Sequence, residues 1–469
     1  MSLANHLKRG IRSICAKNIV MVIFGLVILE CCAKLYDIQT LNKLDSGDLI
    51  KKRDENKIVW HKFKNTFYQE LQTSTGIFLL YKAYLDVRQE PTVRIIGYLN
   101  QHPPRIETYC KLTYKTPDED VVRKVNYIQL DNWYFSKMKN KTHQAIIYQP
   151  YLISCDLPPM NETRLPTAVS LVEDRAIKEV TNRLNIIYNK QTGPKDMFGV
   201  CCRALKFRED ISFRIVEWLE LLKILGATKV FLYKTELHPN THKTIMAYDE
   251  SGFVQLNNFS VPEYNPNEID HLGLKDNVLY SELLPIQDCA YSNMNRFNYF
   301  AVLDIDEVIV PTHNKTWMHI LEALERGNVS INQPSLTFQN AYFLQQYKES
   351  NKEGPFKEIP TYNYMLQQVY RAKDHLGPNI NCKSFQNTLQ TLIFYNHKSE
   401  RCLKNSECNR YSVDLSIGQL NHYRSSCSKE YEKFCSNSIP TVKDITIWTW
   451  KKELMENMNK SLLDLGLII

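Results

Sequence analysis

The pattern of apolar and polar positions changes near residue 193. From about residue 75 to 190, short runs rich in β-branched and aromatic residues alternate with turns, for example at 77–80 and 93–98, which predicts a small β-rich domain. Beyond residue 193, apolar strand-like runs alternate with segments of helical periodicity. This alternation predicts an α/β domain with a mostly parallel sheet flanked by helices.

The sequence predicts individual helices and strands within this second region. Apolar positions spaced three or four residues apart mark a helix that Gly226 is expected to end. Ligands of open α/β sheets bind at the carboxyl ends of the strands, so these ends are where a site is expected. The predicted strands lie near 197–202, 230–233, 252–256 and 299–303, and the predicted helices near 211–225, 277–296 and 316–326.

The N-terminus carries an apolar run, residues 19–29, after a purely basic flank. The run is short for a bilayer span, and either an uncleaved anchor or a signal peptide accounts for it. The charge bias favours an anchor with the N-terminus in the cytoplasm and the rest in the lumen. The expected divisions are a cytoplasmic tail at 1–18, an anchor at 19–33, a stem at 34–74, a β-rich domain at 75–190, a catalytic domain at 191–450 and a helical tail at 451–469.

Composition refines this picture. The 469 residues carry a net charge of +7, which is too small and too dispersed for a nucleic-acid-binding surface. Thirteen cysteines include ten beyond the N-terminal segment, an even set that favours disulfides in an oxidising compartment. Cys110 and Cys155 are expected to pair, and the four cysteines at 402, 408, 427 and 435 are close enough to pair locally. Six Asn-x-Ser/Thr sites permit glycosylation there.

The candidate chemistry centres on residues 299–311, where an apolar run ends in Asp304, Asp306 and Glu307. Carboxylates at the end of a buried strand are costly unless they meet a cation, a donor or water, and no Lys or Arg lies nearby in sequence. In an extended chain Asp304 and Asp306 point to the same side. Two converging carboxylates predict a site for a hard divalent cation with room for phosphates.

A cation held by Asp304 and Asp306 would stabilise the negative charge that develops on a leaving diphosphate, as glycosyl transfer from a nucleotide sugar requires. His422 is the first candidate for a third metal ligand and His397 the second. Arg424 or Lys383 would add positive charge against the phosphates.

Two other classes fit parts of the pattern. An Asp-x-Asp after an apolar strand also occurs in phosphatases of the haloacid dehalogenase type, where the first Asp is a nucleophile. That class also needs further paired carboxylates, and no adjacent aspartates follow Glu307. A non-catalytic lumenal carbohydrate-binding protein is the remaining alternative.

An ordered set of motifs resembles glycosyltransferase family 92. The resemblance covers roughly residues 75–424, and its pieces are Ala83–Arg88, Leu225–Ala227, Val230–Tyr233, Gln287–Cys289, Tyr299–Glu307 and His422–Arg424. The strand continuing as Cys201-Cys202-Arg203 departs from the pattern of the family and puts the uridine contacts in question.

The resemblance implies a GT-A fold, a type II Golgi membrane protein, and an inverting transferase that uses a UDP-sugar and Mn²⁺. Members of the family add β-linked galactose, in several cases to fucose on N-glycan cores. Asp304 and Asp306 match the motif for metal and nucleotide sugar, and Asp288 is a further candidate nucleotide contact. Inversion needs a carboxylate base, for which Glu307 and Asp374 are the candidates.

Overall fold

The structure is a computed structural model of the chain. It describes residues 67–101, 103–115, 121–130, 148–158, 165–177, 179–262, 280–313, 315–350, 355–404, 408–427, 432–436 and 439–469. All of these belong to one compact unit, Val59–Ile469. The predicted cytoplasmic tail and anchor lie outside the described residues. Among the helices that the structure describes, none is long and apolar enough to cross a membrane.

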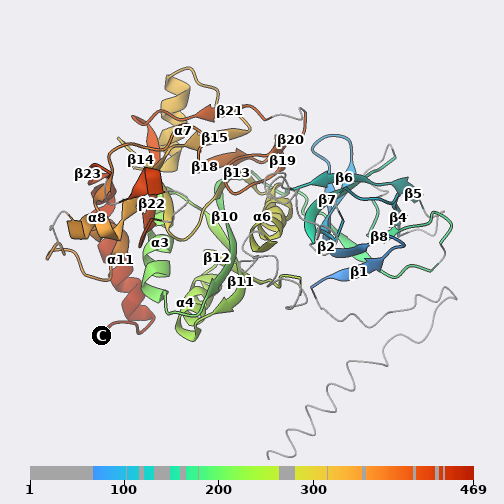
Figure 1. Cartoon of the computed structure of the whole chain (residues 1–469), viewed down its shortest axis with the longest axis horizontal. Coiled ribbons are helices and arrows are strands. Elements are labelled where there is room, and N and C mark those ends of the chain that lie inside the picture. Colours follow the sequence, from blue (N-terminus) through green and yellow to red (C-terminus); the bar gives the residue numbers. More distant parts are fainter. Residues whose placement is uncertain are drawn as a thin grey trace, which may run out of the picture. The chain divides into compact units, whose positions relative to one another are not determined.

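The predicted β-rich region forms a nine-stranded sheet in the described part of the chain (Figure 1). Its pairings are antiparallel except for the parallel pair β2–β9. The first strand falls within the segment predicted as a stem, so ordered structure begins earlier than the sequence pattern indicated. The strands are β1 Gln69–Gln72, β2 Ile77–Asp86, β3 Thr92–Leu99, β4 Tyr109–Thr113, β5 Val121–Lys124, β6 Asn126–Gln129, β7 Gln149–Asp156, β8 Ala168–Val172 and β9 Leu184–Ile187.

The second region contains a seven-stranded mixed sheet in the order β12-β11-β10-β13-β18-β15-β21. Its first four strands are parallel, as the alternating pattern predicts, whereas β18 runs antiparallel to both of its neighbours. Helix α4 was not predicted, because its hydrophobic face is weak. The elements are β10 Asp196–Phe207, α3 Ser212–Leu225, β11 Lys229–Leu237, α4 Pro239–Glu250, β12 Val254–Asn258, α6 Tyr280–Asn293, β13 Phe297–Val302, α7 Trp317–Arg326, β15 Ser335–Phe338, β18 Lys383–Asn387 and β21 Arg410–Ser412.

Helix α3 ends as predicted. Gly226 adopts a left-handed conformation with φ of 103° and caps the helix, its N–H donating to the carbonyls of Leu222 and Lys223. A residue with a Cβ adopts this conformation at a cost, so glycine is the natural stop. The next strand, β11, begins at Lys229, which places α3 directly between two parallel strands.

A smaller five-stranded sheet, in the order β14-β22-β16-β17-β23, lies beside the end of β13 (Figure 1). Its strands β14 and β22 are antiparallel and pair Glu307 with His422. The sequence pattern had left most of this region unassigned, because its strands are only three to seven residues long. The remaining elements are β14 Glu307–Pro311, β16 Asn340–Leu344, α8 Gln345–Ser350, α9 Tyr364–Gln367, β17 Tyr370–Ala372, β19 Thr391–Ile393, β20 Arg401–Cys402, β22 Gly418–Arg424, α10 Glu432–Cys435, β23 Thr441–Lys443, the 3₁₀ helix η3 Thr446–Trp450 and α11 Lys451–Asp464.

Helix α11 is part of the core. Leu454, Met458 and Leu462 are buried in the same cluster as the apolar face of α3. The Ser461 hydroxyl also donates to a carboxylate oxygen of Glu220 in α3, at 3.0 Å. The residues predicted as a helical tail are therefore helical and packed.

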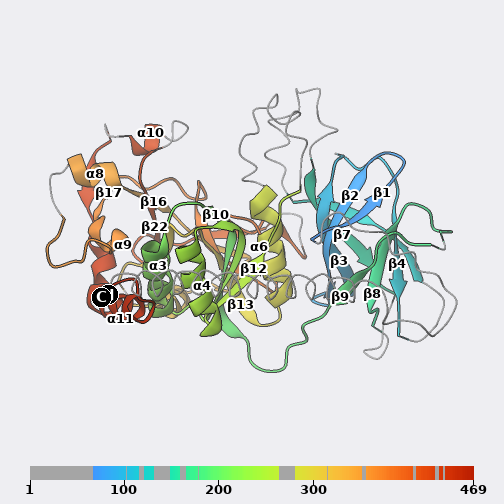
Figure 2. The same ribbon diagram turned by 90° about the horizontal axis from the view of Figure 1, so that it is seen from below.

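Helix α6 joins the β-rich sheet to the mixed sheet (Figure 2). Its residues Leu284 and Ile286 lie in one buried cluster with Tyr98 of β3, Leu152 of β7 and Phe300 of β13. The two predicted domains therefore share a hydrophobic core through α6. This continuity is consistent with their membership in one compact unit.

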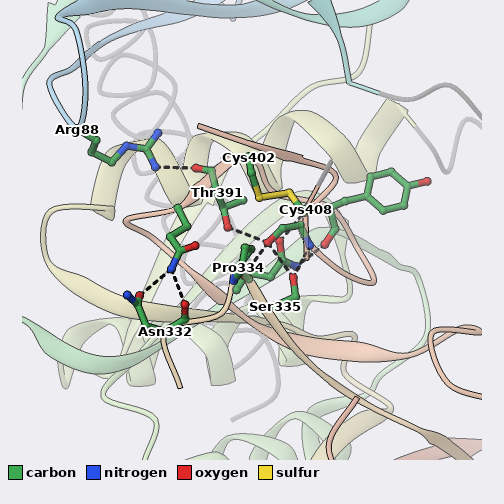
Figure 3. Close-up of a disulfide and its surroundings, with 11 residues drawn as sticks. Arg88, Asn332, Pro334, Ser335, Thr391, Cys402 and Cys408 are labelled. Atoms are coloured by element: carbon green, nitrogen blue, oxygen red, sulfur yellow. Dashed lines mark hydrogen bonds between the residues drawn. A yellow bond between two sulfur atoms is a disulfide. The ribbon is translucent and has the colours of Figure 1, made fainter. Parts of the chain in front are cut away.

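A second link between the two sheets is polar and lies near the β19–β20 hairpin (Figure 3). Arg88, which follows β2, donates from Nη1 to the carbonyl oxygens of Thr388 at 2.6 Å and Thr391 at 2.7 Å. The carboxylate of Asp86 holds the same guanidinium, 2.8 Å from Nε. Because Arg88 is buried and fully partnered, this contact fixes the hairpin on the β-rich sheet.

Eight of the ten predicted disulfide cysteines are paired. The bond Cys110–Cys155 confirms the expected pair, and the bonds Cys402–Cys408 and Cys427–Cys435 confirm that the four C-terminal cysteines pair locally. The fourth bond, Cys201–Cys289, was not predicted and joins β10 to α6. Cys202 and Cys382 are buried free thiols.

Removing the Cys201–Cys289 bond by alanine substitution of both residues is expected to lower the free energy of unfolding by about 2–4 kcal/mol. The bond closes a loop of 88 residues, so it restricts the unfolded chain strongly. Urea denaturation measures the loss. The matched control removes Cys402–Cys408, whose separation is 6 residues, and should cost less. An equal or smaller loss at Cys201–Cys289 would contradict this account.

Candidate functional site

The acidic residues lie in a turn between β13 and β14. The backbone N–H of Leu303 donates to the carbonyl of Cys201 at 3.1 Å, which continues the pairing of β13 with β10. The chain then turns, and the N–H of Glu307 donates to the carbonyl of Asp304 at 3.0 Å. Asp304 and Asp306 are thus not in the extended conformation from which their common direction was predicted. Both nevertheless line the same cleft.

This cleft has a volume of about 640 Å³. Residues 202–207 at the end of β10 and 235–236 at the end of β11 form one wall. The turn 304–306 and residues 423–425 at the end of β22 form another. The cleft therefore lies at the carboxyl ends of parallel strands, where the sheet topology predicts a binding site.

Asp304 is paired with two cations that come from distant strands. Its Oδ1 lies 3.0 Å from Nε of Arg203 in β10, and its Oδ2 lies 3.2 Å from Nζ of Lys383 in β18. Burial alone would raise the pKa of Asp304, but the charges of Lys383 and Arg203 outweigh it and hold that pKa well below its ordinary value. Both partners lie close to Asp304 in space and far from it in sequence, so the absence of a Lys or Arg nearby in the sequence does not exclude pairing.

Asp306 faces the imidazole of His422. Its Oδ2 lies 3.5 Å from Nε2 of His422, and the other ring nitrogen lies 3.4 Å from a carboxylate oxygen of Glu307. Burial would lower the pKa of His422, but Glu307 and Asp306 together raise it. The prediction that His422 accompanies the acidic pair is supported by this geometry. The alternative, His397, is half-buried with Nδ1 2.8 Å from the carbonyl oxygen of Cys382, and desolvation lowers its pKa to about 4.

Glu307 does not line the cleft. Its side chain is 3% exposed, its Oε2 lies 2.8 Å from Nζ of Lys383, and the same oxygen accepts the backbone N–H of Asp304 at 3.0 Å. Burial raises the pKa of Glu307 despite the charge of Lys383. The structure gives Glu307 the role of orienting Lys383, Asp304 and His422, so the geometry does not support Glu307 as the base that touches an acceptor.

The other predicted base, Asp374, is exposed and lies outside the residues that line the cleft. Asp374 is a candidate base by its residue type alone, which carries no information on its position in the fold. Neither candidate lines the cleft, and the assignment of the base stays a prediction.

Asp288 also lies elsewhere. It is 1% exposed, and its carboxylate accepts hydrogen bonds from Lys82 Nζ at 2.8 Å, from Tyr233 at 2.9 Å and from Tyr84. These partners come from both sheets, so Asp288 fastens α6 between them. The expected nucleotide contact is not supported, because the carboxylate is fully occupied inside the protein.

Positive charge lines the cleft as well. Arg424 does so as predicted, together with Arg203, Lys206 and Arg214, which sequence reasoning did not select. Arg214 lies in the first turn of α3, where an arginine has no pattern that distinguishes it from an ordinary surface residue. Only the folded position of α3 brings it to the cleft.

The residues fit a divalent cation in part. Within the described ranges, no group of three or more His, Cys, Asp or Glu side chains is arranged to hold a metal ion. Asp306 and His422 offer one carboxylate and one imidazole close together, a donor pair that suits Mn²⁺. Asp304 has both oxygens engaged by Arg203 and Lys383, so its direct ligation of a metal stays a prediction.

Comparison with known families places the chain in the class of glycosyltransferases. The profile described as "Glycosyltransferase family 92" matches residues 196–458, more than half of the chain, from the first residue of β10 into α11. The chain belongs to glycosyltransferase family 92. This membership confirms the resemblance seen in the motifs and decides against the phosphatase alternative.

Among curated proteins, the chain is similar to the beta-1,4-galactosyltransferase galt-1 of Caenorhabditis elegans. The two sequences are 24% identical over 204 residues. The alignment covers 41% of this chain and 46% of the relative, so it spans less than half of either protein.

Proposed function

We propose that the protein is an inverting glycosyltransferase of the GT-A type that moves galactose from UDP-galactose to a glycan acceptor such as a fucose on an N-glycan core. The observation that carries this proposal is the cleft at the carboxyl ends of β10 and β11, lined by Asp304 and Asp306 within the segment that matches family 92. The name of the similar nematode protein supports galactose as the sugar.

The donor is expected to place its diphosphate against the turn 304–306. Asp306 and His422 would hold a divalent cation, Mn²⁺ by the resemblance, and when bound this cation would neutralise the charge on the leaving UDP. Asp304 is held in place by Arg203 and Lys383. Arg424 lines the same cleft and contributes positive charge toward the phosphates.

The proposed setting is the Golgi lumen, with residues 19–33 as a type II membrane anchor. Three observations are compatible with it: the basic flank before the apolar run, the six glycosylation sites and the four disulfides. Fluorescence microscopy of the tagged full-length protein beside a Golgi marker tests the location.

The activity is tested by incubating the purified full-length protein with a panel of UDP-sugars and fucosylated or unfucosylated N-glycans. We expect release of UDP that is fastest with UDP-galactose and that is lost with a chelator and restored by Mn²⁺. Transfer from another UDP-sugar would contradict the proposed donor but would still support glycosyl transfer as the reaction. Absence of transfer from every donor, with retained binding of glycans, would favour the non-catalytic alternative.

A further inference from the structure

Two arginines in the cleft have no carboxylate partner among the described residues. Arg214 of α3 and Arg424 of β22 both line the cleft, and neither forms an ion pair with any part of the chain that the structure describes. Other arginines of the protein are paired: Arg203 with Asp304 at 3.0 Å, Arg371 with Asp444 at 2.7 Å. Guanidinium groups that face a cleft without a counter-ion are suited to an anionic ligand.

The guanidinium of Arg214 stacks on the aromatic ring of Tyr364. Its guanidinium carbon lies 4.5 Å from the centroid of Tyr364, the first residue of the short helix α9. A cation over an aromatic face gains electrostatic energy without losing its hydrogen-bond donors in the plane of the guanidinium. The planar edge of Arg214 therefore remains available to a ligand.

The position of Tyr364 is in turn fixed by contacts between α9 and α3, the helix that carries Arg214. Glu217, three residues after Arg214 on α3, is fully buried and accepts the backbone N–H groups of Met365 at 2.9 Å and Leu366 at 3.4 Å. These bonds anchor the start of α9 to α3 next to Tyr364. Since residues i and i+3 share a helix face, Glu217 and Tyr364 together set the direction of Arg214.

The position relative to the acidic turn suggests which part of the donor is bound. Arg214 and Asp306 line the same cleft, so both side chains face the space in which a ligand would be bound. A diphosphate seated against Asp306 through a cation would thus lie near Arg214 as well. The guanidinium of Arg214 would then donate hydrogen bonds to phosphate oxygens that do not contact the cation.

We propose that Arg214, held on Tyr364 by the Glu217–α9 contact and acting with Arg424, binds the diphosphate of the nucleotide-sugar donor. This inference rests on the proposed function. It adds a binding residue outside the acidic motif and assigns a purpose to the short helix α9.

The test compares the binding of UDP and uridine by ligand-observed NMR titration of the full-length protein with Mn²⁺. Arg214→Met is expected to weaken UDP binding about 10- to 100-fold, as loss of charge-assisted hydrogen bonds would, and to leave uridine binding within about twofold. Arg214→Lys keeps the charge but loses the planar guanidinium, so its affinity for UDP should fall less than that of Arg214→Met. Arg326→Met, an exposed arginine at the end of α7, is the matched control and should bind UDP normally.

The outcomes separate the two proposals. Unchanged UDP binding by Arg214→Met, or an equal loss for UDP and uridine, would overturn the role of Arg214, because the second result indicates a merely structural effect. If Arg214→Met does not fold, the Arg214→Lys comparison decides, and an unchanged UDP-to-uridine ratio there overturns the inference. Failure of the unmodified protein to bind UDP would instead overturn the proposed function and, with it, this inference.

Discussion

Asp306→Asn is expected to reduce sugar transfer at least a hundredfold. Asp306 lines the cleft and contacts His422, and its carboxylate is the one acid of the turn without a Lys or Arg ion pair among the described residues. Removing a group that stabilises charge in the transition state typically costs a factor of about 10²–10³ in rate. Initial rates of UDP release over a range of donor concentrations measure the effect as kcat/KM.

Asp374→Asn is the control for this experiment. Asp374 is exposed and lies outside the cleft-lining residues, so its replacement should leave the rate within about twofold. A similar loss in both variants, or full activity of Asp306→Asn with a normal melting temperature, would contradict the assignment of the site.

Lys383→Met is expected to lower the free energy of unfolding by about 3–5 kcal/mol. The side chain of Lys383 is 0% exposed and compensates two carboxylates, Asp304 at 3.2 Å and Glu307 at 2.8 Å. Its loss leaves the buried carboxylate of Glu307 without its ammonium partner, with the imidazole of His422 still 3.4 Å away. Urea denaturation at pH 8, followed by circular dichroism, measures the loss.

The loss of unfolding free energy caused by Lys383→Met should be smaller at pH 5 than at pH 8. Burial raises the pKa of Glu307, so its charged form is disfavoured in the folded state and the associated stability decreases as pH rises. In Lys383→Met this trend should steepen, since protonation of Glu307 removes the unpaired charge. Lys124→Met, which removes an exposed ion pair with Glu107, should show no measurable change at either pH. A pH-independent loss at Lys383 would contradict this reasoning.

The parallel core of the mixed sheet could be predicted because its strands are buried on both faces. The apolar runs that became β10, β11 and β13 stand out from polar surroundings, and the 3.6-residue spacing of α3 with Gly226 defines the helix between two of them. Shorter strands such as β17 and β23 have only three residues each, too few for a periodic pattern to appear.

The acidic pair could also be predicted, since charges at the end of an apolar run need compensation. Its partners could not. Arg203 and Lys383 lie 101 and 79 positions from Asp304 and reach it only because β10 and β18 both flank β13. For the same reason the sequence could not show that Asp288, a candidate nucleotide contact, accepts hydrogen bonds from residues of both sheets.

The burial of α11 has a consequence for gene variants that end the protein early. A stop codon near position 450 would delete only about twenty residues. The deletion would nevertheless remove Leu454, Met458 and Leu462, which pack in one buried cluster with the apolar face of α3. Because α3 also carries Arg214, which lines the cleft, such a shortened product would lose the packing that positions this wall of the cleft as well as part of its core. Late-truncating alleles should therefore behave as nulls instead of mild variants.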